Sequence, residues 1–291
     1  MQNSFLLHEI LRSHWAIEPQ TALANGSIIA ALIEGKHTDF VPRGDWKFEF
    51  ASGKERQSAN SFDQAPAGTV AIIPIKGSML KYGTLCSYGT QEIAEVMQQA
   101  FASKKISGIV LDIDSGGGSV NSIPPLSNLM VGRNKPVVAL ADTAASAAYY
   151  VAASCDHIMA DNSLSAGFGS IGVVTSFADM QPFWELKGVK FHTIYPPESK
   201  DKNLAFEKAL KGDYEAIIDE ILSPLARKFQ YHVKAARGTR LKTDTAGVLS
   251  GKMFFAGDAL NAGLIDSIGS LQQAIDKALE LAEVYKFMRT K

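Results

Sequence analysis

From residue 69 onward, short apolar runs alternate with segments of helical periodicity, and this alternation restricts the fold more than any other feature. The run TVAIIPI is followed by the helical pattern QEIAEVMQQAFAS, then by the run GIVLDID, a further helix and the run PVVALA. Strands that are buried on both faces of a parallel sheet read as continuous apolar runs, and helices connect them. The pattern therefore predicts an α/β domain around a parallel sheet.

The two ends of the chain have helical patterns of their own. FLLHEIL and TALANGSIIAALIEG predict two helices near the start, and the polar segment GKERQSANSFDQAPAG reads as a linker. Near the end, FEKALKGDYEAIIDEILSPLARKFQYHVKAARG predicts a long amphipathic helical region, and SLQQAIDKALELAEVYKFM predicts a closing helix. We therefore expect a helical appendage and linker over residues 1–65 and the main domain over residues 66–291.

Charge and composition exclude several classes of protein. The 29 basic and 30 acidic residues leave a net charge of -1, so no nucleic-acid partner is expected. The two cysteines, Cys86 and Cys155, lack the spacing of a zinc site or a disulfide framework. The start MQNSFLLHEILRSHW does not read as an export signal, and no uninterrupted apolar run reaches the roughly 18 residues of a membrane span. We expect a cytoplasmic protein without a membrane span.

A glycine-rich loop, DSGGGSV at residues 114–120, lies between the run GIVLDID and a predicted helix. Three glycines allow backbone N–H groups to turn toward a ligand at the helix N-terminus. The loop lacks the Lys followed by Ser or Thr of a Walker phosphate loop. An oxyanion hole and a simple tight turn both remain open.

A second segment, ADTAASAAYYVAAS at residues 141–154, surrounds Ser146 with small residues directly after a predicted strand. A serine at such a strand-to-helix entry is accessible to a substrate backbone, as a nucleophile requires. The alternative is an alanine-rich helix packed in the core, in which Ser146 only fills space.

Four ordered segments, DSGGG, AASAAYY, SAGFGSIGVV and MFFAGDALNAGLIDSIGSLQQAI, together resemble the signal peptide peptidase A family of bacterial and phage serine proteases. The resemblance covers roughly residues 69–283. It implies the Clp protease/crotonase-like fold of ββα units, ring-like homo-oligomers, and peptide-bond hydrolysis without a cofactor or metal.

The resemblance also implies roles for particular residues. It places the nucleophile at Ser146 and the oxyanion-hole donors at the backbone N–H groups of Gly118 and Ala147. The usual Ser-Pro-Gly-Gly of the family's loop is Ser115-Gly116-Gly117-Gly118 here. Loss of the proline loosens the unfolded loop but keeps the two glycines that the hole needs.

The general base implied by the family is a lysine, and HTIYPPESKDKNLAF is the matching segment. Lys200 is the better match, Lys202 is the rival, and Ser170 is a candidate for positioning the lysine. A lysine with an ordinary pKa of about 10.4 must have it lowered by roughly 2.5 to 3.5 units to act as a base near pH 7. Without the resemblance, a lysine in such a polar run reads as a solvated surface charge.

Two other interpretations of catalytic motifs are weaker. His157 and His192 are the histidines that follow Ser146 within the next 50 residues, but neither has the spacing of a Clp-type triad, so packing is the default for both. GFGSIG, residues 167–172, matches the dinucleotide-binding pattern letter by letter. The following VVTSF reads as a strand rather than the helix that this pattern requires.

The sequence thus predicts a Ser-Lys dyad endopeptidase that acts on a peptide or protein substrate. The family contains soluble head-maturation proteases of phages and prophages, so a capsid or scaffold protein is the expected substrate and the cytoplasm of a bacterial host the expected location. A general cytoplasmic protease of the signal-peptide-peptidase type is the first alternative. A crotonase-like acyl-CoA enzyme and an inactive assembly scaffold are the others.

Overall fold

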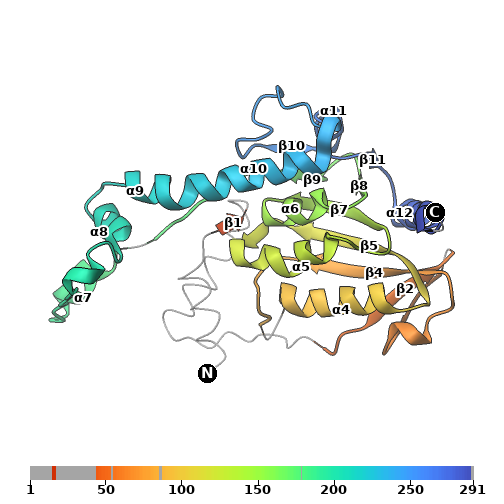
Figure 1. Cartoon of the computed structure of the whole chain (residues 1–291), viewed down its shortest axis with the longest axis horizontal. Helices are drawn as coiled ribbons and strands as arrows, with labels where there is room; N and C mark the ends of the chain where they lie inside the picture. Colours follow the sequence, from red (N-terminus) through yellow and green to blue (C-terminus); the bar gives the residue numbers. More distant parts are fainter. Residues whose placement is uncertain (1–14, 18–43, 54, 85–86, 178, 290–291) are drawn as a thin grey trace.

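The structure is a computed structural model that describes residues 15–17, 44–53, 55–84, 87–177 and 179–289. Figure 1 shows an α/β body from which a long helical arm projects. The two helices expected before residue 44, and Cys86, lie outside the described residues.

Within the described part of the chain, the body is built on one nine-stranded sheet with a parallel centre. The path of paired strands is β10-β9-β7-β5-β4-β2-β3, and β8 pairs with β7 and β11. The expected runs near residues 69, 108 and 137 form its central strands. The strands are β2 (Phe48–Ser52), β3 (Glu55–Ala59), β4 (Thr69–Lys76), β5 (Ile106–Ser115), β7 (Val137–Ala145), β8 (His157–Ala160), β9 (Gly167–Gly169), β10 (Met253–Phe255) and β11 (Ser267–Ile268).

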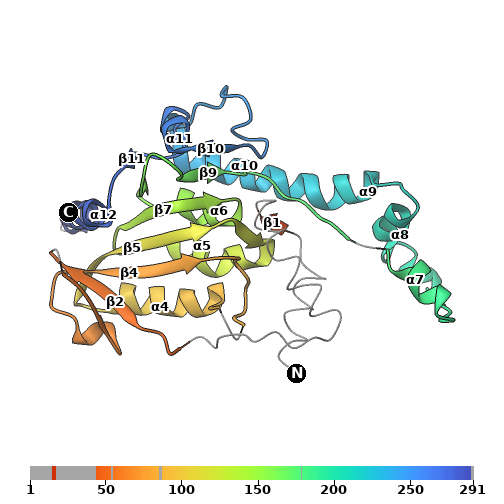
Figure 2. The same cartoon turned by 180° about the vertical axis from the view of Figure 1, so that it is seen from behind.

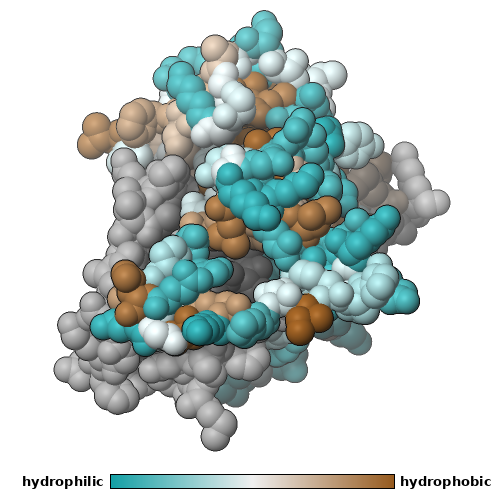
Figure 3. Space-filling model, turned by 90° about the vertical axis from the view of Figure 1, so that its left-hand side faces the viewer, coloured by the Kyte–Doolittle hydropathy of each residue, from teal (hydrophilic) through white to brown (hydrophobic). Residues whose placement is uncertain are grey.

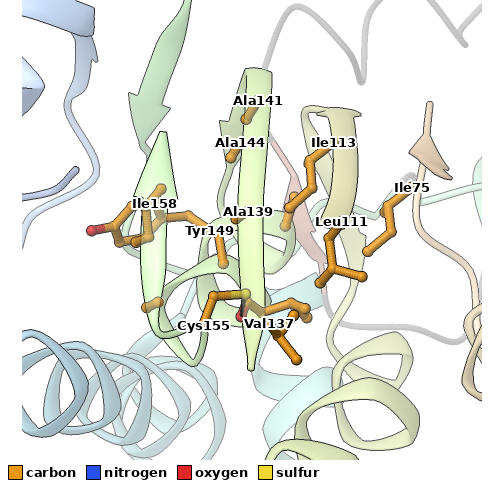
Figure 4. Packing of buried hydrophobic residues seen from close by; sticks show 14 of the residues in the cluster. Ile75, Leu111, Ile113, Val137, Ala139, Ala141, Ala144, Tyr149, Cys155 and Ile158 are labelled. Atoms are coloured by element: carbon orange, nitrogen blue, oxygen red, sulfur yellow. Dashed lines mark hydrogen bonds between the residues drawn. The ribbon is translucent and has the colours of Figure 1, made fainter. Parts of the chain in front are cut away.

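Helices cover both faces of this sheet, as a buried parallel sheet requires. On one face lie α4 (Thr90–Ala102), α5 (Ile123–Met130) and α6 (Ala147–Ala153), and on the other lies the C-terminal α12 (Leu271–Arg289). Alternate residues of β4 divide between two apolar clusters: Ile73 and Ile75 pack on the α4 side, and Val70 and Ile72 pack on the α12 side. Figure 4 shows part of the first cluster, in which Leu111 and Ile113 lie between Ile75 and the residues of β7.

The sheet begins earlier than the sequence pattern indicated. Residues 44–65, which the sequence assigned to the appendage and linker, contain the antiparallel pair β2 and β3, and β2 also pairs with β4. Phe50 and Phe62 are each 2% exposed in the core. The linker interpretation missed β3 because this edge strand is exposed on nearly all its residues and therefore has no alternation of apolar and polar side chains.

The arm comprises α7 (Gln181–Leu186), η3 (Pro197–Ser199), α8 (Leu204–Leu210), α9 (Glu215–Ile217), the π-helical turn η4 (Ile218–Leu222) and α10 (Ser223–Arg237). Figures 1 and 2 show α7 and α8 at its far end, away from the sheet, while the end of α10 packs on the body. The expected helical region near residues 205–237 is present, with a break at Gly212, whose φ is 86°. The expected strand at VVTSF does not form.

Short elements complete the body. They are β1 (Trp15–Ile17), η1 (Phe62–Gln64), β6 (Gly117–Ser119), η2 (Val120–Ser122), η5 (Gly238–Arg240) and α11 (Ala256–Asn261). The described helices include none that is long and apolar enough to cross a membrane.

Candidate active site

Ser146 occupies the sharp turn between β7 and α6. Its φ of 52° and ψ of -118° lie outside the regions that non-glycine residues normally adopt, and the residue is 1% exposed. Its N–H donates to the carbonyl oxygen of Gly169 at 2.9 Å, and its own carbonyl accepts from the N–H of Tyr150 at 2.9 Å, which starts the helix. A strained serine on a strand–turn–helix connection is the geometry of a nucleophile elbow.

The side chain of Ser146 is held loosely. Its Oγ donates a hydrogen bond of 3.4 Å to the carbonyl oxygen of Gly172, which is long for a hydroxyl donor. The flanking residues Ala145 and Ala147 are both fully buried and small. The hydroxyl group is therefore kept in one place by the backbone rather than by a strong side-chain bond.

The segment GFGSIG forms a wall of this site instead of a nucleotide-binding loop. Gly169, at the end of β9, has a φ of 121°, and a Cβ there would lie 2.5 Å from the carbonyl oxygen of Lys252. The next residue, Ser170, has a φ of 52° and donates its N–H to the same carbonyl at 3.0 Å. Residues 173–177, which follow these glycines directly, do not form a helix.

The glycine loop supplies a second wall, the short strand β6. The N–H of Met79 donates to the carbonyl of Gly117 at 2.8 Å, and the N–H of Ser119 donates to the carbonyl of Met79 at 3.0 Å. Since hydrogen-bonding groups alternate between the edges of a strand, the N–H and C=O of Gly118 point to the edge opposite Met79. A Cβ on Gly118 would lie 1.9 Å from the carbonyl oxygen of Met79, so glycine is required there.

Ser115 holds the start of this loop in position through two hydrogen bonds of its side chain. Its Oγ donates to the carbonyl of Gly77 and accepts from the N–H of Gly117 at 3.1 Å. These bonds fix the loop in the absence of the proline that the family's pattern has at position 116. Strand β6 packs against α6, so the structure brings Gly118 close to the helix that Ala147 opens.

The two candidate lysines lie far from this cluster within one chain. Lys200 follows η3 and Lys202 precedes α8, and both are exposed. Figures 1 and 2 both show this segment at the far end of the arm, well apart from α6. A single chain thus brings together Ser146, Gly118, Ala147 and Ser170 but leaves the lysines outside.

The histidines do not replace the lysine. His157 begins β8 and pairs with Val138 near the start of β7, whereas Ser146 follows the end of β7, so the two lie at opposite ends of the sheet. Nε2 of His157 lies 2.7 Å from Oγ of Ser267, and burial lowers the pKa of this histidine. His192 is exposed on the arm.

Two other reactive side chains, Cys155 and His232, lie near α6. Burial raises the pKa of the Cys155 thiol to about 12, which makes it a poor nucleophile. His232 stacks on Tyr150, and its Nε2 lies 3.0 Å from Oγ of Ser154, at the far end of α6 from Ser146. Across the part of the chain that the structure describes, no three His, Cys, Asp or Glu side chains gather as metal ligands.

Sequence reasoning missed the backbone partners of this site: the carbonyls of Gly169 and Gly172, which accept from Ser146, and the carbonyl of Lys252, which accepts from Ser170. The glycines were visible in GFGSIG, but their role depends on β9 lying between β7 and β10. That pairing joins residues more than 80 positions apart in the chain, and a local motif does not reveal it.

The chain has the α/β fold that the sequence predicted, and it presents a strained serine at a helix N-terminus beside a glycine-rich strand, an arrangement typical of serine hydrolases. The chain belongs to peptidase family S49, whose sequence model matches residues 130–285. This is the family to which the four sequence motifs pointed, and the chain spans less than half the length of the relatives reported below.

Two relatives named in the comparison of sequences agree with the family assignment. The chain is 31% identical to the chloroplastic serine protease SPPA of Arabidopsis thaliana, over 74% of this chain and 32% of that protein. It is 28% identical to the head-tail preconnector protein GP5 of Enterobacteria phage P21, over 71% of this chain and 42% of that protein. A mutant of the 1510-N membrane-bound stomatin-specific protease in complex with a substrate peptide superposes with a TM-score of 0.44 at 12% identity, covering 71% of this chain and 76% of that one.

Proposed function

We propose that the protein is a serine endopeptidase in which Ser146 is the nucleophile, Lys200 is the general base, and the N–H groups of Gly118 and Ala147 bind the oxyanion. The observation that carries this proposal is the backbone of Ser146, whose positive φ of 52° holds the hydroxyl at the entry to α6. A packing serine gains nothing from such strain, whereas in a nucleophile elbow this conformation presents the hydroxyl group at the strand-to-helix turn.

The chemistry follows from these positions. The neutral lysine accepts the proton of Ser146 Oγ as this oxygen attacks the carbonyl carbon of the scissile bond. The carbonyl oxygen becomes negative and accepts hydrogen bonds from the two N–H groups, each of which typically contributes about 3 to 4 kcal/mol to the transition state. The amine leaves with the proton returned by the lysine, and water then hydrolyses the acyl-enzyme.

The position of Lys200 favours a base supplied by a neighbouring chain. The arm exposes several large apolar side chains, among them Phe183 at 47% and Trp184 at 46%. Figure 3, which faces the side where α7 and α8 lie, shows apolar patches scattered among hydrophilic side chains. Docking of the arm against a second copy would cover this surface and desolvate the lysine, which lowers its pKa. A ring-like homo-oligomer meets both needs.

The biological role that we propose is maturation of a phage or prophage head in the cytoplasm of a bacterial host, with a capsid or scaffold protein as substrate. The phage relative, named as a head-tail preconnector protein, supports this role. The plant relative named as serine protease SPPA keeps a general protease of the signal-peptide-peptidase type as the alternative. A crotonase-like acyl-CoA enzyme shares the two-amide hole but needs no strained serine.

A fluorophosphonate probe followed by peptide mass spectrometry tests the proposal directly. The probe should modify Ser146 in the assembled protein, and Ser146→Ala should abolish the label. Ser154→Ala, on the same helix, is the matched control and should keep it. A reactive protein in which the label lies elsewhere, or an unlabelled protein that is folded and assembled, contradicts the proposed nucleophile.

A further inference from the structure

Strand β1 lies on the glycine strand of the active site. Trp15, Ala16 and Ile17 pair in antiparallel fashion with Ser119, Gly118 and Gly117, respectively. Figures 1 and 2 show β1 near α5 and α6, at the edge of the body. The chain thus places its own extended segment against the strand that carries a proposed oxyanion donor.

Strand β1 pairs with the edge of β6 that carries the N–H of Gly118, the proposed oxyanion donor. Met79 takes the opposite edge of β6 through its bonds to Gly117 and Ser119. The N–H and C=O of Gly118 therefore point toward Ala16, its register partner. A substrate whose scissile carbonyl reaches the N–H of Gly118 must approach along this same edge. An extended polypeptide does so by adding a strand, with main-chain hydrogen bonds supplying affinity.

We infer that β1 is a built-in competitor for substrate: Trp15–Ile17 occupies the docking edge of β6, and an extended polypeptide binds there as an antiparallel strand only after β1 has left it. This inference rests on the proposed function for the identity of the substrate. It assigns the N-terminal segment a role in controlling access to Ser146.

The pairing has the strength that a displaceable competitor needs. A ladder of three residues contributes little by itself, because each net hydrogen bond is worth only about 0.5 to 1.5 kcal/mol. Attachment to the same chain compensates, since a segment of the same chain competes at an effective concentration on the order of millimolar. A substrate with a longer extended segment can bind this edge more tightly than β1 does, whereas a short peptide competes poorly with β1.

Proline substitutions at two adjacent positions separate pairing from other effects. The N–H of Ala16 faces β6, so Ala16→Pro removes a ladder donor and should release β1. The N–H of Ile17 faces away from β6 by the same alternation, so Ile17→Pro is the matched control and should leave β1 in place. Both variants are made in the full chain with Ser146→Ala, so that no probe is cleaved.

The probe is a fluorescein-labelled peptide with the sequence of residues 11–21, LRSHWAIEPQT, and its binding is followed by anisotropy. We expect Ala16→Pro to bind this peptide about tenfold more tightly than the parent or Ile17→Pro, because the internal strand no longer competes. A probe with proline in place of its own alanine should bind at least several-fold more weakly to the released protein. Equal affinity for all three proteins, or no binding to the released one, overturns the inference.

The hydrolytic readout keeps the two proposals distinguishable. With Ser146 intact, Ala16→Pro should lower KM for an extended fluorogenic peptide and leave kcat unchanged. The binding experiment needs no catalysis. If the protein fails to react with fluorophosphonate, the proposed mechanism is ruled out, but peptide binding still tests whether β1 competes for the edge of β6. Conversely, if the protein is active and Ala16→Pro leaves KM unchanged, only the proposed role of β1 as a competitor is ruled out.

Discussion

The N–H of Ser146 donates a 2.9 Å hydrogen bond to the carbonyl oxygen of Gly169, which joins the end of β7 to the end of β9. The same two strands pair in parallel from Thr143 to Ala145. The bond therefore extends the sheet ladder by one residue into the turn and fixes the serine in its positive-φ conformation. The geometry of Ser146 thus depends on β9, a strand that follows it later in the chain.

Removal of the hydroxyl group tests the nucleophile. Ser146→Ala should lower peptide hydrolysis by at least about a thousandfold, because nucleophile substitutions in serine proteases cost this much or more. The melting temperature should change little, since the lost bond to Gly172 is 3.4 Å long and alanine fits between two alanines. Ser154→Ala should retain activity. Substantial hydrolysis by the Ser146→Ala protein would assign the nucleophile elsewhere.

A pair of glycine substitutions tests the wall formed by β9. Gly169→Ala introduces a Cβ 2.5 Å from the carbonyl oxygen of Lys252 at a φ of 121°, so it should displace the turn and abolish activity. Backbone strain alone costs of order 1 to 3 kcal/mol. Gly172→Ala is the control, because its nearest neighbour lies 3.9 Å away, and it should keep most of the stability. Urea denaturation of both variants gives the comparison, and equal stability would contradict the structure.

These contacts show what the sequence reveals and what it does not. The central strands were predicted because burial on both faces makes each a nearly continuous apolar run, as in Ile109–Leu111 of β5. Strand β3 was missed because its side chains are exposed, and Trp15–Ile17 because three residues carry no periodicity. Ser146 was predicted as the nucleophile from its small neighbours and the family resemblance, whereas the carbonyl of Lys252 reaches Ser170 only through tertiary pairing.

Arg237, at the end of α10, forms an ion pair with Asp266 that is largely shielded from solvent. Arg237 is 1% exposed and donates from Nη1 and Nη2 to Asp266 at 2.9 and 2.8 Å. Burial alone would raise the pKa of Asp266, but the bonds from Arg237 hold it below the usual value. Asp266→Asn should lower the free energy of unfolding by about 3 to 5 kcal/mol, because it leaves a buried guanidinium unpaired.

The exposed pair of Lys286 with Glu283 is the control for this effect. Both side chains are more than 60% exposed. Glu283→Gln should therefore change the free energy of unfolding by less than about 1 kcal/mol. Chemical denaturation of the two variants measures the difference, and a similar small loss in both would show that the Arg237 pair is not buried in solution.

Two histidines make stability depend on pH. Burial lowers the pKa of both His157 and His232 below the unfolded value of about 6.5. Between the lowered pKa and 6.5 the unfolded chain binds more protons than the folded protein, so the free energy of unfolding falls as the pH drops through this window. Urea midpoints at pH 7.5 and pH 5 should show the loss, and His232→Gln should reduce it. A midpoint that rises on acidification would contradict the burial of these rings.

The general base is tested by subunit mixing, because Lys200 lies on the arm and Ser146 in the body. Lys200→Ala should abolish hydrolysis as fully as Ser146→Ala, and Lys202→Ala should cost little, since members of one catalytic unit are not additive. If the arm reaches a neighbouring chain, a mixture of the Ser146→Ala and Lys200→Ala proteins should recover activity. Equal mixing should restore about a quarter of the sites, because each of the two contributing chains is intact in half the cases.

The controls for this mixing experiment decide between two arrangements of the site. Subunit exchange is verified with differently tagged chains, and each inactive protein alone gives the baseline. No recovery after confirmed exchange would place both residues in one chain, with an arm that folds back on its own body. Recovery with Lys202→Ala as the inactive partner, and none with Lys200→Ala, would transfer the base to Lys202. Recovery with Lys200→Ala that disappears when the arm's Trp184 is changed to Glu would show that its apolar surface carries the lysine to the neighbouring serine.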